Sequence, residues 1–201
     1  MNQSLVFVGS NANMSQMIDL ARLQGYTNLA IVDHDYYGNT NAIEGIPVIG
    51  SEQSHRWSAR HDYFMAVNWF PEKTDVQKRN KQKRQRLIGL LAQEKITCVN
   101  LLHPTAIIPG TVILGQGLMI CAGAIIGNHS VINDFVQIRE HAYLAHHARI
   151  GHGSVIQVYG YVGSHISLGP DCYVGIRASC VQQNIRIPDN SFIKSHELHK
   201  G

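Results

Sequence analysis

The chain has 201 residues, of which 44% are hydrophobic and 15% are charged, and its formal net charge at pH 7 is +3. This composition is ordinary for a globular protein, and so small a net charge gives no reason to expect a nucleic-acid partner. No apolar run reaches the roughly 18 residues that would span a bilayer, and the first residues lack the basic flank of a signal peptide. The four cysteines lack the spacing of a metal or redox motif. We therefore expect a cytoplasmic protein with reduced thiols.

The first half of the chain alternates apolar strand-like runs with helical patterns. The pattern predicts strands over 4–9, 28–33, 47–49, 62–67 and 97–102, and helices over 14–24, 52–60 and 74–95. The first strand, helix and second strand make a βαβ unit. Open α/β sheets bind ligands beyond the carboxyl ends of such strands. We therefore predict a Rossmann-like domain over residues 1–103.

Polar residues follow the first two predicted strands. They are Ser10, Asn11, Asn13, Asp33 and Asp35. The first turn lacks a full G-x-G-x-x-G motif, so as a nucleotide signal it is weak and fits a tight turn equally well.

The helix predicted over 74–95 carries a run of basic residues, namely Lys78, Arg79, Lys81, Lys83, Arg84 and Arg86. Such a run on a surface helix is usually a solvated face. The other interpretation is a docking surface for the phosphates of a nucleotide or of coenzyme A. The sequence leaves both open.

From about Thr105 to Ile193 an aliphatic side chain recurs at every sixth position. The column is Ile108, Leu114, Ile120, Ile126, Ile132, Ile138, Leu144, Ile150, Ile156, Val162, Leu168 and Val174, then Cys180 and, after a one-residue slip, Ile187 and Ile193. A period of six fits a parallel β-helix, in which each hexapeptide is one short strand plus a turn. Three hexapeptides make a coil of 18 residues, and stacked coils bury one another's aliphatic faces. We predict this fold for residues 104–201.

A coil of 18 residues places certain polar residues above one another. His129, His147 and His165 should stack at one corner, with Asn128, His146 and Ser164 beside them. The histidine ladder fits either corner packing with mutual hydrogen bonds or a polar strip along a cleft between subunits.

The segments VFVGS, DLARLQGY, VD and GIPVIG, then VNLLHPTAIIP and the hexapeptides, resemble one family in this order. It comprises bacterial sugar O- and N-acetyltransferases with left-handed β-helices, including sialic acid O-acetyltransferases and nucleotide-sugar N-acetyltransferases that act on amino-dideoxy sugars. The resemblance covers residues 4–193. It implies a left-handed coil, a homotrimer, an N-terminal domain that holds the nucleotide sugar, acetyl-CoA between adjacent β-helices, and a role in surface polysaccharide biosynthesis.

The family's catalytic histidine lies in a segment similar to I-x-x-x-A-x-(I/L)-x-H-(D/E)-x-x-I-G, which residues 138–151 match. The resemblance places His146 as general base, a role in which a neutral imidazole accepts the proton of the attacking amine or hydroxyl. The alternative is a surface histidine at a corner. The acidic neighbour usual in the family is His147 here, and a second family histidine, which contacts the thioester, is Val155. Two nearby residues that would substitute are Glu140 and His141.

The resemblance also implies binding sites for both substrates. For acetyl-CoA it points to backbone groups at Gly163 and Ser164 and to the corner at Ile176. For the nucleotide sugar it points to Ser10, Asn11, Asn13, Asp33 and Asp35, with Asp35 facing the ribose or base.

A metal site is the main alternative for the histidines, because gamma-type carbonic anhydrases are also trimeric left-handed β-helices and bind zinc through three histidines. The pairs His141/His146 and His147/His152 have the five-residue separation of two such ligands. The third ligand would fall near position 105 or 111, and both are threonine. We therefore expect no metal.

The sequence thus predicts an acetyl-CoA-dependent acetyltransferase that acts on a nucleotide-linked 4-amino-4,6-dideoxy sugar. Transfer should be direct, because no cysteine or serine near His146 is placed to carry the acyl group. Three alternatives remain: a sugar O-acetyltransferase of the sialic acid type, a zinc-dependent hydratase, and a non-catalytic trimeric relative that binds nucleotide sugars.

Overall fold

The computed structural model describes residues 3–11, 13–67 and 75–200. Contacts within the chain divide it into two compact units, Met1–Leu101 and Leu102–Gly201, close to the boundary expected after residue 103. Within the described ranges, no helix is both long enough and apolar enough to cross a membrane.

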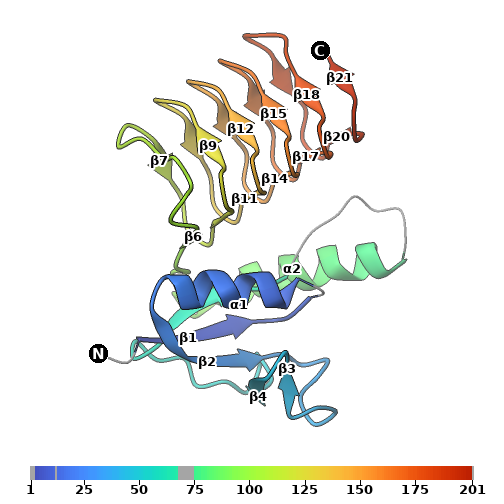
Figure 1. The fold of residues 1–201 in the computed structure, drawn as a ribbon. Coiled ribbons are helices and arrows are strands. Elements are labelled where there is room, and N and C mark those ends of the chain that lie inside the picture. Colours follow the sequence, from blue (N-terminus) through green and yellow to red (C-terminus); the bar gives the residue numbers. More distant parts are fainter. Residues whose placement is uncertain (1–2, 12, 68–74, 201) are drawn as a thin grey trace. The chain divides into compact units, whose positions relative to one another are not determined.

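The first unit contains a five-stranded mixed sheet and two helices (Figure 1). Its strands are β1 (Gln3–Val8), β2 (Tyr26–Val32), β3 (Ala42–Ile43), β4 (Ile46–Gly50) and β5 (Asp62–Met65), and its helices are α1 (Met14–Leu23) and α2 (Asp75–Gln93). The strand order is β3-β4-β2-β1-β5, with β3 antiparallel to β4 and the other pairs parallel. The structure shows a small mixed sheet with two helices here, and the Rossmann-like character of this domain stays a prediction.

The βαβ unit forms for the reasons that the sequence pattern indicates. Strand β1 is an apolar run with neighbours on both sides, and its residues 5–8 are buried. Helix α1 buries one apolar face, formed by Met14, Met17, Ile18, Leu20 and Ala21. The chain leaves this helix at Gly25, whose φ of +90° suits glycine and whose amide donates to the carbonyl of Arg22 (2.9 Å).

One predicted element of the chain before the repeat is wrong, and another is shorter than predicted. Residues 52–60 form turns, not a helix, because side-chain oxygens accept the backbone amides of this segment. The amide of Ser58 donates to the Tyr63 hydroxyl (2.9 Å), and that of Ser54 to Ser51 Oγ (3.3 Å). The strand predicted over 97–102 is confirmed only in its last two residues, which form β6 (Leu101–Leu102).

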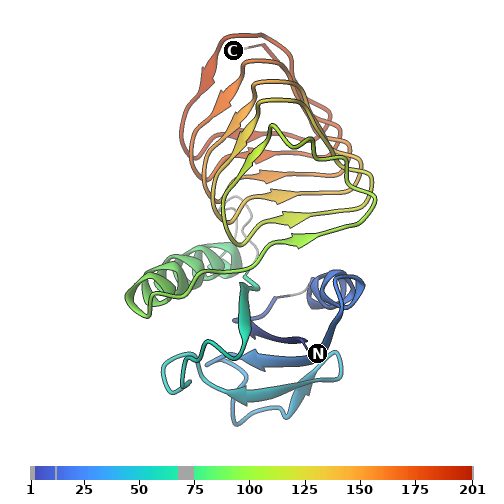
Figure 2. The ribbon, with the colours of Figure 1, turned by 90° about the vertical axis from the view of Figure 1, so that its left-hand side faces the viewer.

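The second unit is a parallel β-helix, which confirms the interpretation of the hexapeptide period. Its two-residue strands form three sheets, and Figure 2 shows the coils as stacked three-sided loops. One sheet contains β7 (Ile113–Leu114), β10 (Val131–Ile132), β13 (Arg149–Ile150), β16 (Ser167–Leu168) and β19 (Arg186–Ile187). Another contains β6, β8 (Met119–Ile120), β11 (Gln137–Ile138), β14 (Val155–Ile156), β17 (Tyr173–Val174) and β20 (Phe192–Ile193). The third contains β9 (Ile125–Ile126), β12 (Tyr143–Leu144), β15 (Tyr161–Val162), β18 (Ser179–Cys180) and β21 (Leu198–His199).

The register of the strands follows the sequence spacing. Val131 pairs with Arg149, and Arg149 pairs with Ser167, so that equivalent residues are 18 apart. After Cys180 the interval grows by one residue, because Leu168 pairs with Ile187. The aliphatic column points inward and forms a single core. Each fully buried isoleucine of this core contributes roughly 1.5–3 kcal/mol relative to an exposed one.

The corners of the β-helix have a backbone rule that the sequence does not reveal. The third residue after most aliphatic positions has a positive φ, between 53° and 61°, whatever its type: His129, Phe135, His141, His147, Tyr159, His165, Asp171 and Arg177. The glycines directly after the aliphatic residues serve a different purpose. A Cβ at Gly127 would overlap the backbone nitrogen of His146, and one at Gly151 would overlap the backbone of Gly169. Glycine at these two positions therefore allows successive coils to approach closely.

Candidate active site

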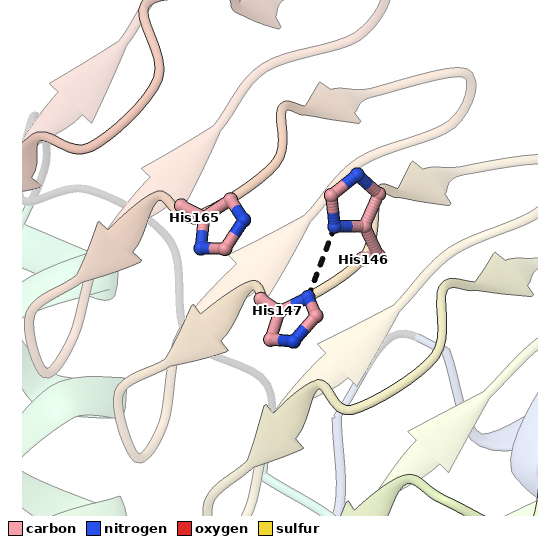
Figure 3. A group of neighbouring side chains, drawn as sticks. All are labelled: His146, His147 and His165. Carbon is pink, nitrogen blue, oxygen red and sulfur yellow. Dashed lines mark hydrogen bonds between the residues drawn. The ribbon is translucent and has the colours of Figure 1, made fainter.

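Two corners of the β-helix bring three imidazoles together. His146 and His147 lie in the turn between β12 and β13, and His165 lies in the turn between β15 and β16 (Figure 3). We call these three residues the histidine cluster. The Nδ1 atoms of His146 and His147 are hydrogen-bonded at 3.0 Å. One of these nitrogens must donate and the other must accept, so the tautomers of the two rings are coupled.

The predicted histidine ladder is confirmed. The ring centroids of His129 and His147 lie 5.1 Å apart, and those of His147 and His165 lie 4.6 Å apart with nearly parallel planes. The backbone holds this spacing, because the amide of His147 donates to the carbonyl of Asn128 (2.9 Å) and that of His165 to the carbonyl of His146 (3.2 Å). The ladder is therefore a consequence of coil geometry, and the exposed rings are available for chemistry.

The surroundings of His147 favour its neutral form. Desolvation by the stacked rings lowers the pKa of His147, and positive charge on His165, His129, His146 and Arg149 lowers it further. A neutral imidazole carries one donor and one acceptor nitrogen, so it can complete a hydrogen bond to His146 in either direction.

A cavity of about 360 Å³ lies beside the ladder. Its lining includes His147 and His165 together with two cationic side chains, Arg149 and Arg186. Such a combination of imidazoles and guanidinium groups suits an anionic ligand.

The other residues that the sequence analysis considered beside the general base are not members of the histidine cluster. His141 stacks on Tyr159, with ring centroids 5.2 Å apart. The carboxylate of Glu140 pairs with Arg139 Nε (3.5 Å). Val155 is buried in β14, with 2% of its surface exposed.

The three positions expected to contact acetyl-CoA are in the later coils. Gly163 and Ser164 are buried, and the amide of Gly163 donates to the carbonyl of Cys180 (2.9 Å). Ile176 has both backbone groups hydrogen-bonded within the chain, to Ser195 Oγ and to the amide of His196, while its side chain is exposed. At Gly163 and Ile176 the amides are therefore already used, and contact would fall to other atoms.

A second polar site lies at the carboxyl ends of β1 and β2. Asp33 is fully buried, accepts a hydrogen bond from Ser10 Oγ (2.5 Å) and pairs with Lys83 Nζ of α2 (2.8 Å). The same ammonium group contacts the more exposed Asp35 (2.7 Å). We call Ser10, Asp33, Asp35 and Lys83 the Asp33 cluster. The structure thus brings three of the predicted residues together, and it adds the lysine that joins them.

The charges of the Asp33 cluster stabilise one another. The hydrogen bond from Lys83 lowers the pKa of Asp35 below its usual value. Burial by itself lowers the pKa of Lys83, but its hydrogen bonds to Asp33 and Asp35 outweigh this and raise it overall. Lys83 and Asp35 are therefore both charged at neutral pH.

The two predicted asparagines shape the turn after β1. The side-chain amide of Asn11 donates to the carbonyl of Ala66, which follows β5. The amide of Asn13 donates to Asn11 Oδ1 (2.5 Å). Asn11 therefore has a structural role in linking two neighbouring strand ends.

Sequence reasoning missed Glu52, a buried acidic residue beside the Asp33 cluster. Glu52 is buried, accepts the amide of His34 (2.7 Å) and pairs with Arg86 (3.5 Å). A cavity of about 510 Å³ is lined by His34, Asp35, Arg79, Asn80, Gln82, Lys83 and Arg86. The basic run of α2 is therefore more than a solvated face. The sequence contained one signal for this site, namely the i, i+3 spacing of Lys83 and Arg86, which places both residues on one side of the helix.

Comparison with known proteins gives structural matches alone, since no protein-family model and no curated protein matches the sequence. PerB from Caulobacter crescentus, solved with CoA and GDP-perosamine, matches with a TM-score of 0.65 and 22% identity over 100% of this chain and 93% of that chain. A mutant of the GDP-perosamine N-acetyltransferase from Caulobacter crescentus matches with a TM-score of 0.61 and 20% identity over 98% of this chain and 95% of that chain. The acetyltransferase domain of PglB from Neisseria gonorrhoeae, solved with acetyl coenzyme A, has a TM-score of 0.59 and 19% identity over 97% of this chain and 86% of that chain. The chain has the fold of these acetyltransferases.

The cysteines of the chain are buried thiols. Cys98, Cys121, Cys172 and Cys180 are all buried, and none of these four forms a disulfide bond. Burial raises the pKa of the Cys121 and Cys180 thiols to about 12. A thiol is nucleophilic only as its thiolate, so neither of these two residues is suited to carry an acyl group at neutral pH.

Proposed function

We propose that the protein transfers an acetyl group from acetyl-CoA to the amino group of a nucleotide-linked amino-dideoxy sugar, with His146 as the general base. The observation that carries this proposal is the hydrogen-bonded pair of His146 and His147 at a β-helix corner. It occurs in a chain that shares its fold, over nearly its whole length, with acetyltransferases solved with CoA, acetyl-CoA and GDP-perosamine.

The hydrogen bond between the two rings assigns a role to each nitrogen. Because Nδ1 of His146 is engaged with His147, Nε2 is the atom left to accept the substrate's proton. In that state the proton of neutral His146 lies on Nδ1 and is donated to Nδ1 of His147, which carries its own proton on Nε2. His147 thereby holds the base in its tautomer and orientation, as the family's acidic residue would.

The proposed step balances without an acyl-enzyme. The neutral amine attacks the thioester carbonyl carbon, and His146 Nε2 takes a proton from the nitrogen as the C–N bond forms. The C–S bond then breaks, and the imidazolium returns the proton to the departing sulfur of CoA. His147 stabilises the imidazolium through a charge-assisted hydrogen bond. A neutral histidine does this less strongly than a carboxylate would, so His146 should be a weaker base than one with an acidic neighbour.

The two cavities suit the two substrates. Arg149 and Arg186, beside the histidine ladder, complement the phosphates of acetyl-CoA, for which Gly163, Ser164 and Ile176 remain proposed contacts. Arg79, Lys83 and Arg86, around the cavity of the first unit, complement the diphosphate of a nucleotide sugar. Asp35 has 58% of its side chain exposed and is the proposed partner of the ribose or base. We propose that four further residues hold the turns of this site in place. They are Ser10, Asn11, Asn13 and Asp33.

We further propose that the working form is a homotrimer with left-handed coils, in which acetyl-CoA lies between adjacent β-helices. Exposed aromatic and aliphatic side chains on the β-helix, among them Ile113 and Tyr143, are consistent with a surface that another copy covers. Sedimentation in dilute solution tests this part of the proposal, since a stable monomer would leave the proposed acetyl-CoA site half formed.

The function is tested by following thiol release from acetyl-CoA against GDP- and UDP-linked sugars, with 4-amino-4,6-dideoxy sugars and their hydroxy counterparts in one panel. We expect turnover with an amino sugar and a product that contains an amide. A product that contains an ester would show O-acetylation instead. The absence of thiol release and of binding with every sugar in the panel would contradict the proposal.

A further inference from the structure

The histidine cluster has the chemistry of a metal site as well as that of a base. One nitrogen each from His146, His147 and His165 lies within 4.8 Å of the other two. Within residues 3–11, 13–67 and 75–200, this is the one group of three histidine, cysteine or acidic residues with ligand atoms so close together. We propose that these three imidazoles bind a divalent transition-metal ion, with Zn²⁺ as the representative, and that the bound ion blocks acetyl transfer. The blocking rests on the proposed function, whereas the binding does not.

The distances fit an ion after small ring rotations. Two imidazole nitrogens bound to one tetrahedral Zn²⁺ at 2.0–2.1 Å lie about 3.3 Å apart. The Nδ1 atoms of His146 and His147 already lie 3.0 Å apart, facing each other. The nitrogen of His165 lies within 4.8 Å of the other two, so it has to move closer by up to about 1.5 Å, and its exposed side chain can do so by rotation about its own bonds.

The backbone under the cluster is held in place by the coil. The amides of His147 and His165 are both hydrogen-bonded to the preceding coil, at 2.9 and 3.2 Å. His147 and His165 occupy equivalent corner positions in successive coils, with φ near +59° in both. Binding an ion therefore requires reorientation of rings and no change of fold, which keeps the cost of ordering the site low.

The ligand set differs from the one that residue spacing suggests. Pairs five residues apart, such as His147 with His152, require a third ligand two coils upstream, where Thr111 stands. In the structure Thr111 occupies the equivalent position 18 residues before His129, and its Oγ accepts the amide of His129 (3.2 Å). The third imidazole comes from downstream, one coil after His147. Three imidazoles suit Zn²⁺, Cu²⁺ and Ni²⁺ and leave a coordination position open to water.

The surroundings limit how tightly the ion is held. Arg149 and Arg186 line the same cavity as His147 and His165, and their charge opposes a divalent cation. We therefore expect micromolar binding, weaker than that of a structural zinc site. Occupancy would take up Nδ1 of His146 and of His147, which are the atoms that the proposed base pair uses. The ion would thus act as a reversible inhibitor.

Binding is measured on the full chain after removal of metal, by calorimetric titration with Zn²⁺ and by the visible absorption of added Co²⁺. We expect one ion per chain. His165→Asn keeps a residue that tolerates positive φ but removes the imidazole, and it should weaken Zn²⁺ binding roughly tenfold or more. His196→Asn is the matched control, since His196 is also exposed with φ of +62° and lies outside the cluster. No binding at millimolar Zn²⁺, or equal affinity in the two variants, would overturn the site.

Activity separates this proposal from the proposed function. For each variant, thiol release is compared with and without Zn²⁺, so that only the ratio matters. The wild type and His196→Asn should be inhibited by Zn²⁺, and His165→Asn should need more of it. Zn²⁺ binding without acetyl transfer to any sugar would support the site and remove the function. Acetyl transfer that Zn²⁺ leaves unchanged, in a protein that binds one Zn²⁺ per chain, would overturn the inhibitory role.

Discussion

The two polar sites of this protein are built in opposite ways. The histidine cluster consists of exposed side chains of one type, stacked at corners that a continuous aliphatic core positions. The Asp33 cluster consists of opposite charges, two of them largely buried, brought together from positions 50 residues apart. In the first site the side chains add little to the fold and are available for chemistry. In the second, part of the polar chemistry is used to stabilise the fold itself, which leaves Asp35 and the neighbouring arginines to meet a ligand.

The largest effect should come from the base. His146→Ala should lower turnover by roughly 10²–10⁴-fold, because it removes the group that accepts the substrate's proton. The free energy of unfolding should change by less than about 0.5 kcal/mol, since the side chain is exposed. Thiol release and urea unfolding measure the two quantities. His147→Asn should cost less activity, because it removes the orienting ring and leaves the base. Full activity in His146→Ala would point to another base, with His141 as the next candidate.

A substitution in the Asp33 cluster should mainly reduce stability, whereas His146→Ala should mainly reduce turnover. Lys83→Met leaves the fully buried Asp33 without its cation, which should reduce the free energy of unfolding by about 3–5 kcal/mol. Urea unfolding measures this value. A change below about 1 kcal/mol would show that the buried carboxylate does not depend on the lysine.

Asp35→Asn is the matched comparison, because it removes the exposed partner of the same lysine. It should cost less than about 1 kcal/mol. The pKa of Asp35 is lowered in the folded state, so its small contribution is present above the unfolded pKa, near 3.8, and is lost as the pH falls through the folded value. A pH series of unfolding midpoints for wild type and Asp35→Asn should therefore converge under acid conditions.

A smaller loss of stability should show whether the close approach of successive coils positions the histidines. Gly127→Ala places a Cβ against the backbone nitrogen of His146, so the coils must shift at a cost of about 1–3 kcal/mol. Gly110→Ala is the control, because a Cβ there meets nothing within 4 Å and should change stability by less than about 0.5 kcal/mol. If the two substitutions prove equal in thermal unfolding, close coil approach at Gly127 does not position His146.

The two regions also differ in how far the sequence predicts them. Each hexapeptide repeats the same local roles, so the column that includes Ile126, Leu144 and Ile150 indicates the core. The interval of 18 residues likewise predicts the ladder that His147 forms with the histidines of the neighbouring coils. The positive φ of the corner residues could not be predicted, because histidine, tyrosine and aspartate all adopt it there.

The first unit lacks such repetition. The contact of Lys83 with Asp33 depends on where α2 lies relative to the carboxyl end of β2, which no local pattern encodes. The helix expected over 52–60 fails because Tyr63 and nearby serines take over its amides. The hydrogen bond between His146 and His147 likewise needed the side-chain geometry, although both residues were candidates from the sequence. Trimer formation and the identity of the sugar remain predictions.

The most direct test of the account is a structure of the protein with CoA and a GDP- or UDP-linked amino-dideoxy sugar. We expect the amino group of the sugar to lie about 3 Å from Nε2 of His146, with Nδ1 still bonded to His147. The diphosphate should contact the basic residues of α2, and the CoA sulfur should lie within reach of the same Nε2 atom, which returns the proton to it. An amine placed at His141, or a sugar bound away from the histidine cluster, would contradict the proposed catalytic role of His146.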